Sequence, residues 1–160
     1  MRPRVAQKMS LSEWNLMIDV NLRGTFLRSR AVVPAMRNSG LGRIVNISST
    51  AALKLFGGAN SASAKAGIQG LIKTLALELG RYGVTVNSVA PGFLVTDLTR
   101  KTAENAGVTI EDMERSMIAK IAVGRVGNPE DIAHAISFFV AKQSCFVSGQ
   151  VLLVAGGPKA

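Results

Sequence analysis

Cysteine is almost absent from this sequence, and its scarcity already excludes several classes of protein. The 160 residues include one cysteine, Cys145, so no disulfide bond can form within the chain. A disulfide-stapled scaffold and a cysteine-cluster metal site are excluded, and a reducing compartment is indicated. We interpret Cys145 as a small core residue rather than a nucleophile. Aromatic residues are also scarce, at 5% of the chain, with a single tyrosine, Tyr82.

Long hydrophobic runs are lacking as well. No apolar stretch approaches the ~20 residues that a membrane-spanning helix needs, so we expect no membrane partner. The N-terminal MRPRVAQKMS carries positive charge without a following apolar segment, which is unlike a secretory signal. We therefore expect a cytoplasmic, soluble protein, although so short a segment leaves a mitochondrial address open.

Acidic side chains are few: 10 against 19 lysines and arginines, which gives a net charge of +9. Such a charge makes nucleic-acid binding one hypothesis. The basic residues are nevertheless scattered, and their densest group, Arg23, Arg28 and Arg30, has no interleaved aromatic residues for base stacking. We therefore expect no nucleic-acid partner, since an acidic carrier or a phosphorylated cofactor explains the charge at least as well.

The first helical pattern runs over about residues 10–38. Its apolar residues recur every three or four positions, as on one face of a helix. Ser10 or Ser12 is the expected N-cap, and Glu13 three residues after Ser10 completes a capping box. Pro34 is expected to kink the helix.

Strands and helices alternate along the rest of the chain. GRIVNISS and VTVNSVAP are short and rich in β-branched residues, and they predict strands at about 43–48 and 84–89. An apolar stripe between them predicts a helix at about 60–80. NPEDIAHAISFFV begins like a helix, with Asn128 as N-cap and a proline next. QVLLVAGG is a continuous apolar run, typical of a strand buried on both faces.

This order predicts an α/β fold, an open parallel sheet with helices on both faces. Ligands of such sheets bind beyond the carboxyl ends of the strands. That edge should hold Ser48-Ser49, Pro91-Gly92 and the polar connection 96–122. We expect this connection to cover a substrate pocket as a lid.

The chain resembles the short-chain dehydrogenase/reductase family in six segments: DVNLRGTF, GRIVNISS, SASAKAG, VTVNSVAPGFLVTD, GRVGNPEDIA and a closing AGG. The likeness is to its 3-oxoacyl-acyl-carrier-protein reductase-like members and covers about residues 9–157. It implies a doubly wound, Rossmann-type sheet and an NAD(P)-dependent oxidoreductase of fatty acid metabolism. The implied reaction reduces the carbonyl of a small molecule or a 3-oxoacyl thioester to an alcohol. The implied cofactor is NADP or NAD, and the sequence does not choose between them.

The family uses an Asn-Ser-Tyr-Lys tetrad, and the resemblance carries three of its members onto this chain. Asn21 matches the asparagine that supports a water relay, and Ser49 matches the serine that hydrogen-bonds the substrate carbonyl. Lys65 matches the lysine that holds the nicotinamide ribose and lowers the pKa of the tyrosine. The tyrosine belongs four residues before that lysine, where this chain has Ser61.

A serine at position 61 lacks the acidity that this chemistry needs. Residues 61 and 65 share a helical face, so a phenol there would lie beside the ammonium group. A phenol starts at a pKa of about 10 and is drawn into the working range by neighbouring positive charge. An aliphatic hydroxyl is far less acidic. Tyr82 lies about five helical turns away and cannot replace the missing phenol.

The assignment of the substrate-binding serine has an alternative. The loop before position 61 is one residue shorter than in most relatives, so counting back from the lysine favours Ser48. The strand motif favours Ser49, which we adopt.

The segment PGFLVT resembles the family's nicotinamide-lining segment. The resemblance therefore implies a set of cofactor contacts: Asn21, Lys65, Pro91, Gly92, Leu94 and Thr96. No metal site is expected, because the single histidine, His134, has no partner at metal-ligand spacing.

No glycine-rich phosphate-binding turn follows a strand in this sequence. A Rossmann site needs such a turn before a helix N-terminus, and the family carries it in roughly three βα units of its opening half. We therefore expect a truncated form with the first nucleotide-binding half missing: a tail at 1–9 and a single C-terminal domain at 10–160. The strand at 43–48 would then be an exposed sheet edge.

Two functions compete on this evidence. By resemblance the chain is an oxidoreductase whose own activity is impaired or absent. Alternatively it is a non-catalytic remnant that acts as an oligomerisation partner. The helices at 10–38 and 60–80 match those that build a dimer interface in the family, so a homo-oligomer through them is expected.

Overall fold

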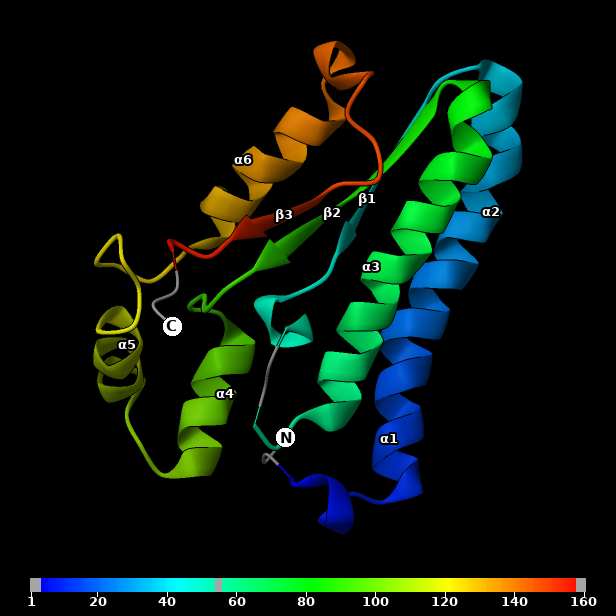
Figure 1. Ribbon diagram of the computed structural model, residues 1–160. Coiled ribbons are helices and arrows are strands. Elements are labelled where there is room, and N and C mark those ends of the chain that lie inside the picture. The colour runs from blue at the N-terminus through cyan, green and yellow to red at the C-terminus, as the bar shows by residue number, and fades with distance from the viewer. Residues whose placement is uncertain (1–3, 54–55, 158–160) are drawn as a thin grey trace.

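A three-stranded parallel sheet forms the centre of the structure, a computed structural model that describes residues 4–53 and 56–157 (Figure 1). The strands are β1 (Gly42–Ile47), β2 (Val84–Pro91) and β3 (Val151–Val154), and β2 lies between the other two. The predicted parallel α/β sheet is confirmed. Within the described residues β1 pairs with β2 alone, so it is a sheet edge, as expected.

Helices cover both faces of this sheet, which confirms the predicted layering. α1 (Leu11–Met17), α2 (Gly24–Ser39) and α3 (Ala59–Leu79) lie on one side, and α6 (Pro129–Val140) lies on the other (Figure 1). Among the described residues, none of the helices is both long and apolar enough to span a membrane. Short 3-10 turns occur between the larger elements, at Ala6–Lys8, Thr50–Ala52, Gly80–Tyr82 and Lys142–Ser144.

The first predicted helix begins as expected but is irregular at an unexpected place. The Ser10 hydroxyl accepts a hydrogen bond from the Glu13 amide at 3.2 Å, and the Glu13 carboxylate accepts one from the Ser10 amide at 2.9 Å. This capping box settles the N-cap as Ser10 rather than Ser12. A π-helical turn, Ile18–Arg23, separates α1 from α2, whereas α2 continues through Pro34. The interruption therefore lies at a backbone bulge and not at the proline.

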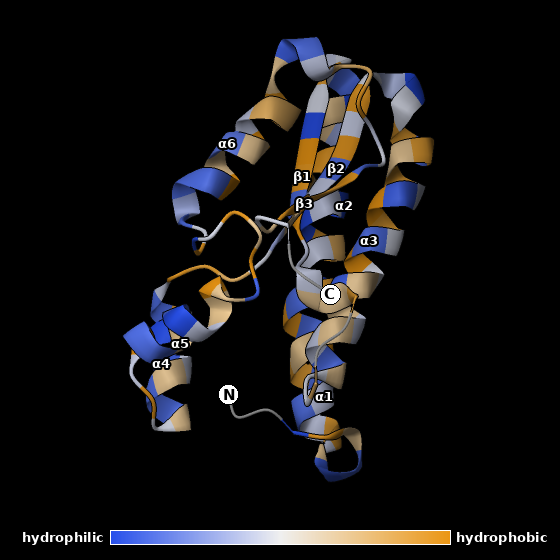
Figure 2. Cartoon of the chain, turned by 60° about the vertical axis from the view of Figure 1, so that its left-hand side comes forward, coloured by the Kyte–Doolittle hydropathy of each residue, from blue (hydrophilic) through white to orange (hydrophobic). Residues whose placement is uncertain are grey.

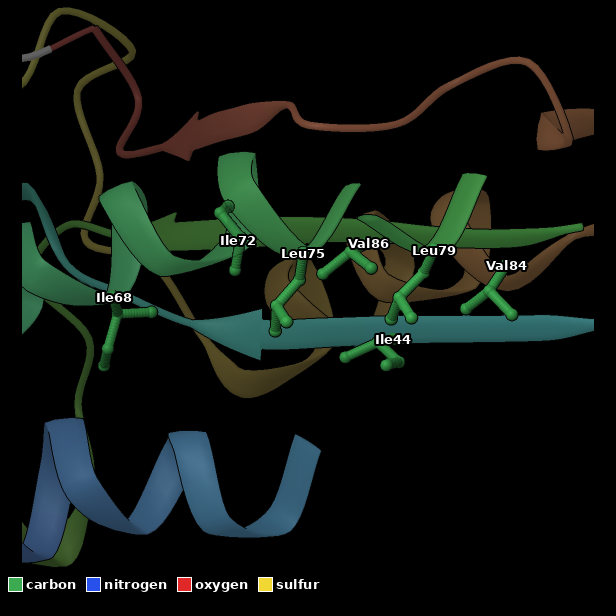
Figure 3. Close-up of a cluster of buried hydrophobic side chains, with 7 residues drawn as sticks. All are labelled: Ile44, Ile68, Ile72, Leu75, Leu79, Val84 and Val86. Carbon is green, nitrogen blue, oxygen red and sulfur yellow. The ribbon is translucent and has the colours of Figure 1, made fainter. Parts of the chain in front are cut away.

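The main hydrophobic core lies between α3 and the sheet (Figure 3). Ile72 of α3 and Val86 of β2 are completely buried, and Ile44 brings β1 into the same cluster. Burying each such side chain stabilises the fold by roughly 1.5–3 kcal/mol. The predicted stripe is confirmed for Ile68, Ile72, Leu75 and Leu79, and Leu71 is half-buried at its margin.

Two burial predictions are wrong. The run QVLLVAGG was expected to be buried on both faces, yet Leu152 and Leu153 of β3 are 40% and 47% exposed. β3 lies at the second edge of the sheet, so it has a strand neighbour on one side only among the described residues. Cys145 was expected in the core, but it lies exposed in the turn after α6.

The connection 96–122 folds into two helices, α4 (Asp97–Ala106) and α5 (Ile110–Ile118). Thr96 and Thr109 cap them through their side-chain oxygens. The two helices pack against each other and contact the rest of the chain sparsely, and each carries both hydrophilic and hydrophobic residues (Figure 2). Their role as a lid stays a prediction.

Candidate active site

The carboxyl ends of the strands bring the predicted site segments to one edge of the sheet. Ser48 follows β1 directly, and its amide donates a hydrogen bond to the Val89 carbonyl of β2 at 2.8 Å. Gly92 follows β2, and its amide donates to the Val154 carbonyl at 3.0 Å. A side chain at Gly92 would place its Cβ 2.8 Å from that of Ala155, so glycine permits this close approach.

The two candidate serines have different surroundings. Ser48 is 2% exposed; its hydroxyl donates to the Lys65 main-chain carbonyl at 2.9 Å and accepts from the side-chain amide of Gln69 at 3.1 Å. That hydroxyl anchors α3 to the end of β1. Ser49 is half-buried, and its oxygen accepts one hydrogen bond, from the Ala51 amide at 3.1 Å. Among the described residues the Ser49 hydroxyl donates no hydrogen bond, so its proton is available to a ligand.

Lys65 reaches back from α3 to the end of β1. Its Nζ donates a hydrogen bond to the Ile47 carbonyl at 3.0 Å. Partial burial lowers the pKa of this ammonium group below its ordinary value. In the described part of the chain no carboxylate lies within 4.0 Å of it. Only the hydrogen bond to Ile47, and no opposite charge in that region, therefore offsets the cost of burying the ammonium group.

Ser61 lies one helical turn before Lys65, half-buried like the lysine. Its hydroxyl makes no hydrogen bond to the lysine within the described residues, so the two groups share a helix face without direct contact. Its amide donates to the side-chain carbonyl of Asn60 at 2.8 Å, and the Asn60 amide group donates to the Glu13 carbonyl at 3.0 Å. Asn60 thus ties the beginning of α3 to α1. The sequence analysis overlooked this buried asparagine, although a polar side chain at a helix start was the available signal.

Asn21 lies in the π-helical turn, which packs against α3. Its side chain donates to the Met17 carbonyl at 3.1 Å, and it makes no hydrogen bond to Ser49, Ser61 or Lys65 among the described residues. Gly67 permits the close packing of this turn on α3, since a Cβ there would lie 2.7 Å from the Leu22 side chain. The structure therefore places Asn21 on the element next to Lys65 without linking the two.

The segment from Pro91 to Thr96 is held by backbone contacts. The Gly127 amide donates to the Phe93 carbonyl at 3.1 Å, and Leu94 pairs with Gly127 as an isolated bridge. The Thr96 side chain is occupied as the N-cap of α4, where it accepts from the Thr99 amide at 3.4 Å. The main chain of Thr96 is occupied too, since its amide donates to the Thr99 hydroxyl at 2.7 Å and its carbonyl accepts from the Arg100 amide at 3.0 Å. Of the two predicted contacts, Leu94 is therefore the better placed to meet a ligand.

A second layer of polar contacts supports the turn at Gly127. Arg125 and Asp131 form a two-pronged ion pair with distances of 2.7 and 2.8 Å, and the Asn128 amide donates to the same carboxylate at 2.9 Å. The hydrogen bonds from Arg125 and from the Asn128 backbone hold the pKa of Asp131 well below its usual range. The sequence analysis identified the Asn128 cap but missed this pair, for which the close spacing of the two charges was a signal.

A cavity of about 690 Å³ lies on the α6 side of the sheet. Phe93, Leu94, Phe138, Leu152 and His134 are among the residues that line it. The predicted site residues other than Leu94 do not line this cavity. In the described ranges no cluster of His, Cys, Asp or Glu residues could hold a metal ion, and His134 stands alone.

At this end of the sheet the structure combines a hydroxyl that can donate, Ser49, with an amine that lacks a counter-ion, Lys65, beside the main chain of the Pro91 turn. Such groups can orient a polarised oxygen and bind a sugar hydroxyl. At position 61 the site holds an aliphatic hydroxyl, which is too weak an acid to donate a proton near neutral pH.

Comparison with known proteins gives matches along almost the whole chain. The family described as Enoyl-(Acyl carrier protein) reductase matches residues 2–159. The chain is 42% identical over 156 residues to the short-chain reductase protein NovJ of Streptomyces niveus. It is 38% identical over 157 residues to the 3-oxoacyl-[acyl-carrier-protein] reductase FabG of Escherichia coli (strain K12), and 40% identical over 151 residues to the (3R)-3-hydroxyacyl-CoA dehydrogenase of Rattus norvegicus.

These alignments cover 98%, 98% and 93% of this chain, but 60%, 62% and 56% of the relatives. The chain therefore spans about three fifths of the length of the relatives that it matches. The family match over residues 2–159, the identities and the parallel α/β sheet agree with one another. The chain belongs to the short-chain dehydrogenase/reductase family.

Proposed function

We propose that this chain forms the carbonyl-binding end of an NAD(P)-dependent oxidoreductase that reduces a ketone to an alcohol. The observation that carries the proposal is the pair formed by Ser49 and Lys65 at the carboxyl ends of the strands. Ser49 donates a hydrogen bond to the substrate carbonyl, and Lys65 binds the nicotinamide ribose. Asn21, on the adjacent π-helical turn, supports a water relay to the lysine.

The cofactor of this proposal is NADP or NAD, which supplies a hydride when bound. The residues present fit its nicotinamide end, because glycine at position 92 lets Ala155 pack closely on the end of β2 and Gly127 fixes the Leu94 turn. The contacts at that end come from Asn21, Lys65, Pro91, Gly92, Leu94 and Thr96. The 160 residues contain no glycine-rich turn after a strand to hold the pyrophosphate, so we expect this chain to bind the cofactor weakly.

The proposed substrate class is a small ketone or a 3-oxoacyl thioester. The relative from Escherichia coli is named a 3-oxoacyl-[acyl-carrier-protein] reductase, which supports an acyl thioester. Ser61 limits what this chain does with such a substrate, because its hydroxyl is too weak an acid to protonate the developing alkoxide. We therefore propose that the chain's own turnover is strongly impaired.

Calorimetric titration of NADPH tests the cofactor assignment. We expect weak binding that does not saturate up to about 1 mM, the upper end of ordinary KM values. Lys65→Met should abolish this weak binding, whereas Lys73→Met, which changes an exposed lysine two turns along the same helix, should leave it unchanged. Equal binding by both variants would remove Lys65 from the proposed cofactor site.

A second candidate function is favoured by the outer surface of the helices. Several large apolar side chains are exposed on α1, α2, α3 and the π-helical turn: Leu16, Val20, Phe26, Leu27, Val32 and Leu77. Exposed apolar groups on neighbouring helices are typical of a protein interface. We propose that these helices pair with a second copy, so the chain acts as an oligomerisation partner.

Sedimentation velocity tests this second candidate. A concentration-dependent dimer is expected, and Val20→Lys together with Leu77→Lys should shift it to monomer. The exposed Leu98 of α4 gives the matched control, since Leu98→Lys should leave association unchanged. A monomer at all concentrations would contradict the pairing.

A further inference from the structure

Lys65 has the surroundings of a reactive amine rather than of an ordinary surface lysine. Its Nζ contacts the Ile47 carbonyl at 3.0 Å, and the described residues place no carboxylate within 4.0 Å. A carbonyl oxygen accepts a hydrogen bond from the amine whether the amine is charged or neutral. Burial without a counter-ion lowers the pKa of Lys65, which raises the fraction that carries a free lone pair.

Ser61 leaves this amine open on one side of the helix. The two residues are four apart, so a large side chain at position 61 would cover the lysine. Serine is small, and within the described residues its hydroxyl does not bond to Nζ. Ser49 lies at the end of β1, next to the carbonyl that holds Nζ, with a hydroxyl proton available to orient an incoming oxygen.

We propose that Lys65 forms a reversible imine with ketones and aldehydes that enter this end of the sheet, 3-oxoacyl thioesters included. For the thioesters the inference rests on the proposed function, because it uses the same carbonyl-binding end. The neutral amine attacks the carbonyl carbon, and the nitrogen loses two protons as the C=N bond forms. The carbonyl oxygen takes up two protons and leaves as water. Nothing is oxidised or reduced in this step.

Borohydride trapping tests this proposal on the intact chain. The chain is incubated separately with propionaldehyde and with an acetoacetyl thioester, each imine is reduced to a stable secondary amine, and the modified lysines are mapped by peptide mass spectrometry. Lys73, an exposed residue of the same helix, is the internal reference. We expect Lys65 to take up label roughly fivefold or more faster than Lys73, as a desolvated lysine does.

Two variants at position 61 separate access from folding. Ser61→Tyr should suppress labelling of Lys65, because the phenol covers the amine and interacts with it, and labelling of Lys73 should not change. Ser61→Ala, which keeps the position small, should leave labelling of Lys65 as it is in the parent chain. Unchanged labelling in Ser61→Tyr would contradict the role given to the open position.

The outcomes distinguish this inference from the proposed function. The imine is overturned if neither reagent labels Lys65 faster than it labels Lys73. Preferential labelling by the aldehyde but not by the thioester supports the imine for simple carbonyl compounds and overturns it for 3-oxoacyl thioesters, whose reduction is judged by turnover of the Ser61→Tyr variant. If neither reagent prefers Lys65 and the Ser61→Tyr variant still reduces the thioester with NADPH, the proposed function stands and the imine is wrong.

Discussion

The two faces of β2 are built from different chemistry. Towards α3 the strand presents Val84 and Val86, which are buried in the main hydrophobic cluster. The alternating residues Thr85, Asn87 and Val89 lie on the opposite side, and all three are buried as well. The Asn87 side chain donates to the Val147 carbonyl at 2.8 Å and accepts from the Gln150 amide at 3.0 Å.

The two layers therefore share apolar packing but differ in its extent, since the buried cluster on the α3 side is the larger. The α3 layer rests on close apolar packing, and the same helix carries Ser61 and Lys65, so packing fixes the candidate site. The α6 layer rests on a smaller apolar cluster of Val89, Ile132, Ala135 and Phe139, and Asn87 adds a polar contact to the segment that follows α6. Beside this layer lies the cavity of about 690 Å³. We therefore expect mutations in the α3 layer to cost more stability than those in the α6 layer.

Truncation of the α3 core should give the largest effect. Ile72 is completely buried, and Ile72→Ala should reduce the free energy of unfolding by about 2–5 kcal/mol through lost burial and a new void. Leu152→Ala, on the cavity side, should cost about 1–1.5 kcal/mol because that side chain is already 40% exposed. Urea denaturation of both variants measures the contrast. Equal losses would contradict the difference between the layers.

The polar contacts of β2 should give the next largest effect. Asn87→Ala removes two part-buried hydrogen bonds, to the Val147 carbonyl and from the Gln150 amide, which should cost roughly 1–3 kcal/mol. Thr85→Val is the matched control on the same face, because the buried Thr85 hydroxyl has no hydrogen-bond partner among the described residues. We expect that variant to be neutral or slightly more stable, as thermal unfolding would show. A destabilised Thr85→Val would mean that this hydroxyl is paired.

The turn between α3 and β2 should respond less strongly. Gly83 has φ +73°, and a Cβ there would collide with the Gly40 carbonyl. Gly107, in the α4–α5 turn, has the same φ but open space around it. Gly107→Ala should cost about 1 kcal/mol for the left-handed backbone alone. Gly83→Ala should cost clearly more, because its Cβ also collides with a carbonyl. Equal midpoints of denaturation for the two variants would show that the backbone around Gly83 shifts without cost.

The pH dependence that comes from Lys65 should be the smallest effect. Its pKa in the folded chain lies below the ordinary 10.5, so the folded state releases its proton first. Below the folded pKa the cost of burying the charge is present in full, and it is relieved as the pH rises towards the unfolded pKa. Stability relative to Lys65→Met should therefore rise with pH in that window. The free energy of unfolding of both chains is measured across this pH window. A difference between them that stays constant or falls with pH would contradict the burial of the Lys65 charge.

The sequence predicted the elements whose signals are local. The Ser10 capping box, the Asn128 cap and the apolar stripe of α3 depend on residues close together in the chain, and each is confirmed. The exposure of Leu152 was predicted wrongly, because burial of a strand depends on how many neighbours it has in the sheet. A run of apolar residues does not indicate how many neighbouring strands there are.

The candidate site was predictable to a similar degree. Motif spacing placed Ser49, Lys65 and the Pro91 turn at one edge of the sheet, and the structure brings those segments together. The different hydrogen bonding of Ser48 and Ser49 could not be predicted, because it depends on where α3 lies over the end of β1. The π-helical turn around Asn21 was missed for a related reason, since a bulge leaves the helical periodicity almost intact.

Reduction of an acetoacetyl thioester by the Ser61→Tyr variant, followed by NADPH absorbance, tests the central claim most directly. The claim is that the carbonyl-binding end is organised around Ser49 and Lys65 and lacks only its acid. We predict slow turnover by Ser61→Tyr that rises linearly with NADPH, and no turnover by the parent chain. Equal rates in the two chains, or no turnover by Ser61→Tyr at any NADPH concentration, would contradict the claim.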